Sequence, residues 1–286
     1  MKNKPMPMEQ HTDLGEAVLF YLDYGGNGPP VVLLHATGFN PWLWHPIASA
    51  LALDCRVIVP SFCDHRESDP DSGGLGWTVL GDDLAAFCKQ SKLPPPLLVG
   101  HSMGGAIAAL AQGRSYLNAR GIILIEPIFL PQEIYARNVT LQDHPLARRA
   151  LKRRNHWKSR NEAREYFIER KLFRLWDSEV LDLYLTRGMK ESADGTLSLA
   201  CSPRQEASLF MGGCLYNPWP LLSTIRCPIL LVEGEHSEYR KLIDFDRISS
   251  LLSNSKRTVI AGAGHLIPME QPATVTTLIR SFQSIV

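Results

Sequence analysis

The residues best suited to chemistry in this sequence are a serine between glycines and a histidine far along the chain. Gly100, Ser102 and Gly104 form a G-x-S-x-G pattern between an apolar segment with strand character and an alanine-rich segment with helical character. A strand-to-helix turn of this kind is tight and strained, so its neighbours must lack side chains. The turn lifts the serine hydroxyl clear of the sheet, and the amides of the following helix face a developing oxyanion. The pattern therefore predicts that Ser102 is a nucleophile.

A serine hydroxyl is a weak nucleophile at neutral pH and needs a general base within hydrogen-bonding reach. His265, in the segment AGAGHLIPMEQP, stands after the last expected strand, which is where this kind of sheet usually supplies the base. The other eight histidines lack such a setting, and we expect them to be surface groups or hydrogen-bonded polar groups. For His101, next to the serine, we expect a side chain that points to the other side of the turn.

Two backbone amides are needed to bind the oxyanion. The sequence predicts that one is the amide of Met103, directly after the serine. For the second we favour the amide of Thr37, in the segment ATGFN that follows the apolar run VVLLH. The nearby aromatic residues Phe39, Trp42 and Trp44 are interpreted as core residues that could equally line an apolar pocket.

A sheet is needed to position the serine, the histidine and the oxyanion amides, and the pattern of apolar residues predicts one. Segments of strand length alternate with amphipathic helical segments, which is typical of an α/β fold with a mostly parallel central sheet flanked by helices. We expect strands over 17–24 (an edge strand), 31–35, 56–60, 96–100, 121–126, 228–233 and 257–260. We expect helices over 44–53, 78–90, 102–113 and 272–285.

The alternation stops between about 130 and 218, where charged helical periodicity continues without a convincing buried strand. The sequence therefore predicts two parts. Residues 1–129 and 219–286 form the α/β core, and residues 130–218 form a helical cap inserted over one edge of the sheet.

Composition limits the classes of partner. The formal net charge of the 286 residues is +1, which gives no general attraction to nucleic acid or membranes. No apolar run reaches the length of a membrane span, because Glu126 and Pro127 interrupt the longest one, and the N-terminal segment has no apolar signal-peptide core. We expect a cytoplasmic protein that acts on a small molecule, and the oligomeric state stays open.

No cofactor or metal is expected, since the nucleotide-binding and metal-binding motifs are absent. The six cysteines lie far apart without a C-x-x-C pair, and we expect reduced thiols; they are Cys55, Cys63, Cys88, Cys201, Cys214 and Cys227. A run of basic residues is interpreted as a solvated helix face rather than a nucleic-acid surface, because acidic residues follow closely. The run consists of Arg148, Arg149, Lys152, Arg153 and Arg154.

Four segments together resemble the α/β-hydrolase superfamily: VVLLHATGF, GHSMGG, CPILLVEGEHSE and GAGHLIPMEQP. The order serine, acid, histidine is also that of the superfamily. The resemblance implies the α/β-hydrolase fold with a helical cap, and a serine-based catalytic triad. One departure lies at 61–68, where SFCDHRES stands in place of the common D-x-R-G-H-G-x-S, so that turn must be built in another way.

The acid of the triad is a second departure. The superfamily usually places it three residues beyond the glycine that follows the late strand, and here that residue is Ser237. Glu238 lies one step further, and Glu126 ends the strand before the insertion, where some branches such as certain haloalkane dehalogenases carry the acid. Glu235 is a weaker third candidate. Glu126 and Glu238 both stay open, because His265 needs only one carboxylate.

The expected reaction is attack of Ser102 on an acyl carbon, followed by release of the acyl-enzyme by water. Hydrolysis of a small, apolar carboxylic ester fits best. A serine nucleophile argues against epoxide hydrolysis and dehalogenation through an alkyl-ester intermediate. Two alternatives stay open: carbon–carbon bond hydrolysis or lyase chemistry on a small metabolite at the same site, and a degenerate hydrolase that only binds a ligand.

Substrate choice must come from the insertion, where apolar side chains could line a pocket, although helical spacing makes most of them packing residues. These side chains are Phe167, Phe173, Leu175, Trp176, Leu181, Leu183, Tyr184, Phe210 and Tyr216.

Overall fold

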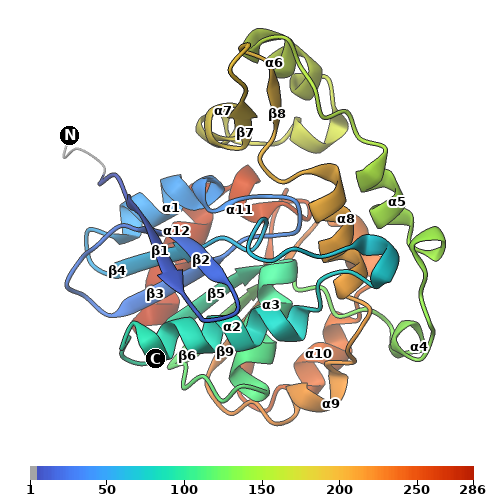
Figure 1. The fold of residues 1–286 in the computed structure, drawn as a ribbon. Helices are drawn as coiled ribbons and strands as arrows, with labels where there is room; N and C mark the ends of the chain where they lie inside the picture. The colour runs from blue at the N-terminus through green and yellow to red at the C-terminus, as the bar shows by residue number, and fades with distance from the viewer. Residues whose placement is uncertain (1–4) are drawn as a thin grey trace.

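A central sheet of eight strands organises the molecule (Figure 1), which a computed structural model describes over residues 5–286. The first four residues of the expected core lie outside the described part. The strand order is β1-β2-β4-β3-β5-β6-β9-β10. The strands are β1 (Met8–Asp13), β2 (Val18–Asp23), β3 (Pro30–Leu34), β4 (Arg56–Pro60), β5 (Leu97–His101), β6 (Gly121–Ile125), β9 (Ile229–Gly234) and β10 (Ser255–Ile260). Among the described strands of this sheet, β1 with β2 and β2 with β4 pair antiparallel and the other neighbours pair parallel, which confirms the expected mostly parallel sheet.

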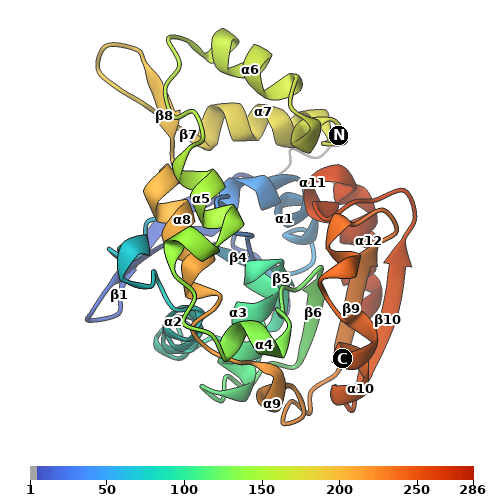
Figure 2. The same ribbon diagram turned by 90° about the vertical axis from the view of Figure 1, so that its right-hand side faces the viewer.

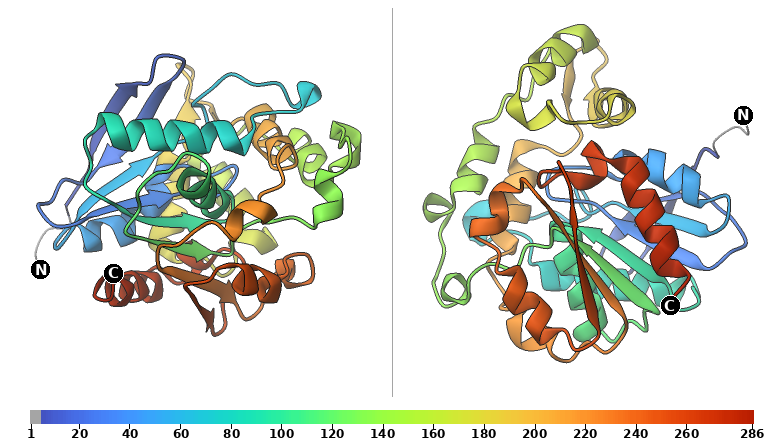
Figure 3. Two further views of the ribbon diagram at one scale, coloured as in Figure 1. Left: turned by 90° about the horizontal axis from the view of Figure 1, so that it is seen from below. Right: turned by 180° about the vertical axis from the view of Figure 1, so that it is seen from behind.

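The middle strands β3, β5 and β6 are buried at every residue, as their unbroken apolar runs require when helices cover both faces of a sheet. Alternate residues of β3 point to opposite faces. Val32 and Leu34 pack in the apolar cluster that contains α2 (Trp77–Gln90) and α3 (Met103–Gly113). Val31 and Leu33 pack in the cluster of α1 (His45–Leu51) and α12 (Pro272–Gln283), which lie on the other face (Figure 3).

The segment between β6 and β9 is mostly helical. Its middle part, which contains α6 (Arg160–Ile168) and α7 (Ser178–Arg187), stands over one end of the core, whereas its last helix, α9 (Trp219–Leu222), lies towards the opposite end (Figure 2). Its elements are α4 (Gln132–Tyr135), α5 (Pro145–Leu151), α6 (Arg160–Ile168), α7 (Ser178–Arg187), β7 (Met189–Glu191), β8 (Leu197–Leu199), α8 (Pro203–Gly212) and α9 (Trp219–Leu222). The sequence missed the hairpin of β7 and β8, because each strand has only three residues and half of their side chains are polar. The remaining short elements are η1 (Pro41–Trp44), η2 (Pro70–Ser72), η3 (Leu141–Asp143), η4 (Lys171–Phe173), η5 (Glu238–Lys241), α10 (Phe245–Leu251) and α11 (Ile267–Glu270).

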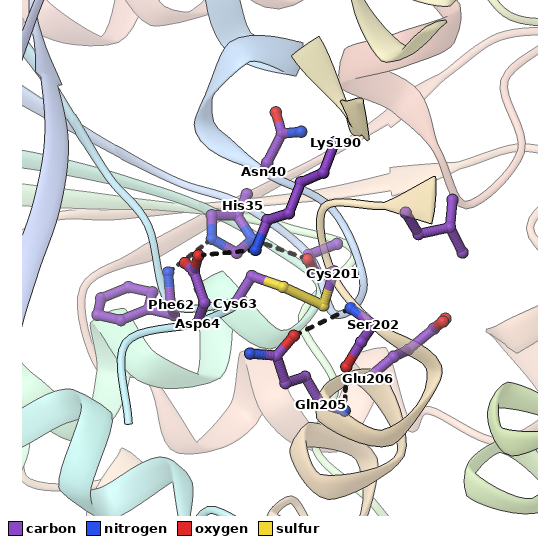
Figure 4. The surroundings of a disulfide bond; sticks show 12 residues. His35, Asn40, Phe62, Cys63, Asp64, Lys190, Cys201, Ser202, Gln205 and Glu206 are labelled. Carbon is purple, nitrogen blue, oxygen red and sulfur yellow. Dashed lines mark hydrogen bonds and ion pairs between the residues drawn. A yellow bond between two sulfur atoms is a disulfide. The ribbon is translucent and has the colours of Figure 1, made fainter. Parts of the chain in front are cut away.

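Two expectations about the strands and cysteines are wrong. Strand β2 is not at the sheet edge, because β1, a largely exposed strand with weak apolar alternation, pairs with it along its whole length. Cys63 and Cys201 are joined in a disulfide, with 5.5 Å between their Cα atoms, although 138 residues separate them (Figure 4). The other four cysteines are free thiols. Within residues 5–286, no helix has the length and apolar character needed to cross a membrane.

Candidate active site

Ser102 occupies the turn between β5 and α3 in a strained backbone conformation, with φ of 56°. A Cβ atom on Gly100 would lie 2.2 Å from the carbonyl oxygen of Gly104, and a Cβ on Gly104 would lie 2.3 Å from that of Leu34. Any side chain at either glycine would force the backbone apart. Ser102 also makes no side-chain capping bond to α3. The turn therefore leaves the Ser102 hydroxyl free to meet another group.

That group is His265. The Ser102 hydroxyl donates to Nε2 of His265 at 3.1 Å, and Nδ1–H of the same ring donates to Oε2 of Glu126 at 3.0 Å. With Nδ1 protonated, Nε2 is the acceptor that a general base needs. The three residues have exposed fractions of 6%, 8% and 1% respectively. The structure thus joins serine, imidazole and carboxylate in one buried chain of hydrogen bonds.

Glu126 is held rigidly at the end of β6. Its backbone has φ of 49°, and its amide donates to the carbonyl of Val232 at 2.8 Å. Carboxylate Oε1 accepts the amide of Gly234 at 2.7 Å, while Oε2 also accepts the hydroxyl of Ser237 at 2.6 Å. Ser237 stands where the family resemblance leads one to expect the acid, and here its side chain orients the carboxylate that comes from another strand.

The other candidate acids do not reach the histidine. Glu238 is exposed at the start of η5, and none of the hydrogen bonds described for His265 involves it. Glu235 is also exposed, and its Oε2 accepts the amide of Gly262 at 2.8 Å. The geometry therefore favours Glu126 as the partner of His265.

The predicted oxyanion donors come from two turns, one after β5 and one after β3. Met103 is the first residue of α3, so its amide has no acceptor within the helix. Thr37 lies in the turn after β3, which closes with a bond of 3.2 Å from the Phe39 amide to the Ala36 carbonyl. Because β3 and β5 are neighbours, this turn and Ser102 meet at the same edge of the sheet.

His101, which we expected to point to the other side of the serine turn, contacts the loop that carries His265. Its Nε2–H donates to the backbone carbonyl of His265 at 2.9 Å, and the two ring centroids are 5.2 Å apart. Burial and the neighbouring His265 hold the pKa of His101 well below its usual value, so this ring is neutral. On η5, the ring of Tyr239 lies 4.3 Å from that of His265. Both residues fix the position of the His265 loop.

The loop at 61–68 is indeed built without the usual glycines. The amide of Phe62 donates to Nε2 of His35 at 2.9 Å. The carboxylate of Asp83 in α2 accepts a hydrogen bond from His65 Nε2–H at 2.6 Å. It also accepts two hydrogen bonds of 2.8 Å from the guanidinium of Arg66. These bonds take over the role of the missing turn motif.

Sequence reasoning missed a polar cluster in the insertion. Arg153 is not part of a solvated face, because its Nη1 donates to Oε2 of Glu206 at 2.5 Å and its Nη2 to the hydroxyl of Tyr184 at 3.1 Å. Burial alone would lower the pKa of Arg153, but Tyr184 and Glu206 raise it. The acid that pairs with Arg153 lies 53 residues further along the chain, so no local pattern could identify it.

Aromatic residues of the insertion meet the turn after β3. The ring of Phe39 lies 5.6 Å from that of Trp176 and 6.2 Å from that of Tyr184. These residues share one apolar cluster with Leu266, next to the histidine. Leu175 and Tyr216 are exposed and do not join it.

Comparison with known proteins identifies a family and several solved structures with the same fold. A model described as "Alpha/beta hydrolase family" matches residues 31–277. The structure of E-2-(acetamidomethylene)succinate hydrolase superposes with a TM-score of 0.82 at 18% identity, covering 97% of this chain and 99% of that one. A thermophilic esterase from Thermogutta terrifontis gives a TM-score of 0.70 at 23% identity, covering 97% and 98%. At such identities the likeness concerns the fold alone.

Curated relatives match over shorter stretches. Protein phosphatase methylesterase 1 of Rattus norvegicus is 30% identical over 107 residues, which cover 35% of this chain and 28% of that protein. The chain spans about a third of the length of the curated relatives it matches first.

Proposed function

Because the chain belongs to the alpha/beta hydrolase family, we propose that it is a serine hydrolase that cleaves a small, apolar carboxylic ester through an acyl-enzyme on Ser102. The observation that carries this proposal is the chain of hydrogen bonds from Ser102 Oγ through His265 to Glu126, at 3.1 Å and 3.0 Å. A buried arrangement of this kind activates a hydroxyl that is otherwise inert at neutral pH.

In the first half of the proposed reaction, Ser102 Oγ attacks the ester carbonyl while Nε2 of His265 takes its proton. Glu126 stays ionised and stabilises the imidazolium. The amides of Thr37 and Met103 bind the oxyanion, helped by the positive end of the α3 dipole. His265 then gives the proton to the leaving alcohol. In the second half a water molecule repeats the sequence on the acyl-enzyme and restores Ser102.

We assign substrate selection to the insertion at 130–218, acting as a cap over the core formed by 1–129 and 219–286. Phe39, Trp176 and Tyr184 pack together between the cap and the oxyanion turn, which supports an apolar substrate. The proposed partner is a small molecule.

An activity-based probe tests the proposal. A fluorophosphonate should label the wild-type protein, and Ser102→Ala should abolish labelling while Ser250→Ala, a change of an exposed serine in α10, should not. Folded wild-type protein that stays unlabelled would favour the ligand-binding alternative. A screen against esters, thioesters, lactones and diketones then separates ester hydrolysis from carbon–carbon cleavage.

A further inference from the structure

The carboxylate of Glu206 lies against the proposed oxyanion turn. Glu206 is on α8 in the insertion and is only 9% exposed. A Cβ atom on Gly38 would lie 2.6 Å from its Oε1 and 2.7 Å from its Cδ. Gly38 directly follows Thr37, whose amide is the proposed second oxyanion donor. A buried carboxylate therefore lies against the residue that directly follows the proposed oxyanion donor.

The orientation of this carboxylate is set by its partner. Oε2 accepts Arg153 Nη1 at 2.5 Å, and Arg153 Nη2 is used by Tyr184. The pair is neutral as a whole, but Oε1 is the part that faces Gly38, and the guanidinium lies on the other oxygen. Because solvent screens buried charges poorly, the turn experiences the nearer, negative end of the pair.

Several contacts prevent Glu206 from moving away. The disulfide attaches Cys201, just before α8, to the core residue Cys63 (Figure 4). Ser202 and Gln205 form a capping box at the start of α8. One turn later, Ser208 binds the core through the amide of Leu75 at 3.0 Å. The carboxylate is thus fixed by its helix on both sides.

From this geometry we propose that Glu206, held by Arg153, makes the site reject esters that carry a carboxylate close to the scissile carbonyl, so that its substrates are uncharged esters. A substrate carboxylate would meet a like charge at short range in a poorly screened site, and Arg153 is already committed to Glu206. Building an unfavourable charge against the wrong ligand is an efficient source of specificity. This inference rests on the proposed function.

Two matched pairs of esters measure this selectivity. The first pair is para-nitrophenyl isocaproate and the mono-para-nitrophenyl ester of succinic acid, which have the same shape and differ in the charge of the acyl chain. The second pair places the charge on the alcohol instead, with the isobutyrate esters of para-hydroxybenzamide and para-hydroxybenzoate. For each pair the readout is the ratio of kcat/KM for the uncharged ester to that for the anionic ester, with spontaneous hydrolysis subtracted.

Glu206→Gln removes the charge and keeps a side chain of the same size that can still bind Arg153. The ratio should fall about tenfold or more in at least one pair, because the anionic ester then meets the positive Arg153 instead of a carboxylate. Intrinsic differences in ester reactivity cancel when the two proteins are compared. Glu191→Gln is the matched control: Glu191 is also paired with an arginine of the insertion, Arg160 at 2.9 Å, but it is 58% exposed. It should leave both ratios unchanged.

Unchanged ratios in Glu206→Gln, in a protein that the fluorophosphonate still labels, would overturn this inference and leave the serine hydrolase intact. Wild-type protein that hydrolyses neither pair and resists the probe would instead overturn the proposed function. Should Glu206→Gln fail to fold, Glu206→Asp withdraws the carboxylate by one methylene and should lower the same ratio by a smaller factor. Equal kcat/KM for both members of each pair in the wild type would also refute the inference.

Discussion

Glu126 and His265 are joined by a hydrogen bond of 3.0 Å although they are 139 positions apart in the sequence. The carboxylate follows β6 and the imidazole follows β10, so the helical segment 130–218 lies between them in the sequence. The sheet order explains why they still meet: β9 pairs with β6 on one side and β10 on the other, and the carboxyl ends of these parallel strands share one edge.

This relationship predicts which acid matters. Glu126→Gln should reduce kcat for the ester that the wild type hydrolyses by about a hundredfold or more, because His265 loses the charge that orients it and stabilises its imidazolium. Glu238→Gln, a change of an exposed glutamate, should alter kcat by less than about twofold. Steady-state kinetics of the two variants decide the matter. Small and equal losses would show that Glu126 is not the acid.

The sequence singles out Ser102 and His265, which the structure joins by a hydrogen bond, but it could not decide which carboxylate lies against His265. Ser102 has a local signature, because the turn demands glycines at fixed spacing, and His265 stands in the loop where a base is usual. Glu126 and Glu238 each follow a strand and look equivalent in one dimension. The structure distinguishes them, because Glu126 is buried and bonds His265, and its carboxylate is held by Gly234 and Ser237. Gly234 and Ser237 lie more than 100 positions further along the chain.

The disulfide between Cys63 and Cys201 should stabilise the protein. It closes a loop of 138 residues, and removing a cross-link of this span costs about 2 to 4 kcal/mol, since the unfolded chain regains freedom. A dithiol reductant should therefore lower the midpoint of urea unfolding of the wild type. In Cys201→Ser the midpoint should already be low and should not respond to the reductant.

The matched control is Cys227→Ser, which removes a partly exposed free thiol and should keep the full response to the reductant. A wild-type midpoint that does not change on reduction would contradict the prediction. No local sequence pattern indicates this bond, because the pairing depends on how the loop after β4 and the start of α8 come together. The buried pairing of Arg153 with Glu206 escaped prediction for the same reason.

Because His35 is buried with a lowered pKa, we expect the protein to lose stability on mild acidification. Burial lowers the pKa of His35 to about 4, although its bond to the Ala36 carbonyl acts in the opposite direction. An unfolded histidine has a pKa near 6.5, so below that value the unfolded state takes up a proton that the folded state refuses. The effect of His35 on the free energy of unfolding is absent above pH 6.5. The free energy of unfolding decreases as the pH falls from 6.5 towards 4, and below 4 His35 causes no further decrease. The loss is on the order of 3 kcal/mol at most.

Urea unfolding at several pH values across this window measures the effect. His35→Gln should flatten the dependence, because glutamine does not titrate and its amide oxygen can accept the Phe62 amide in place of Nε2. Part of the slope should remain, since His101 has a lowered pKa as well. An identical slope in the wild type and in His35→Gln would rule out His35 as a source of the dependence.

A substitution at Gly38 tests whether Glu206 of the insertion contacts the proposed oxyanion turn. Its φ is +77°, and a Cβ would strike the Glu206 carboxylate at 2.6 Å. Gly195, in the turn between β7 and β8, has a similar φ of +80° but open space around its Cβ position. Gly38→Ala and Gly195→Ala therefore share the backbone strain, of order 1 kcal/mol, and differ in the collision.

We expect Gly195→Ala to lower stability slightly and to leave kcat/KM unchanged, whereas Gly38→Ala should lower kcat/KM by about tenfold or more, because the turn that carries the Thr37 amide must move. Combining Gly38→Ala with Glu206→Ala should restore part of this loss, since the smaller side chain removes the obstacle while the strain remains. Such a departure from additivity is the mark of two groups in direct contact. Equal kcat/KM for Gly38→Ala and Gly195→Ala would mean that Glu206 does not contact the turn. Strictly additive effects of Gly38→Ala and Glu206→Ala in the double variant would mean the same.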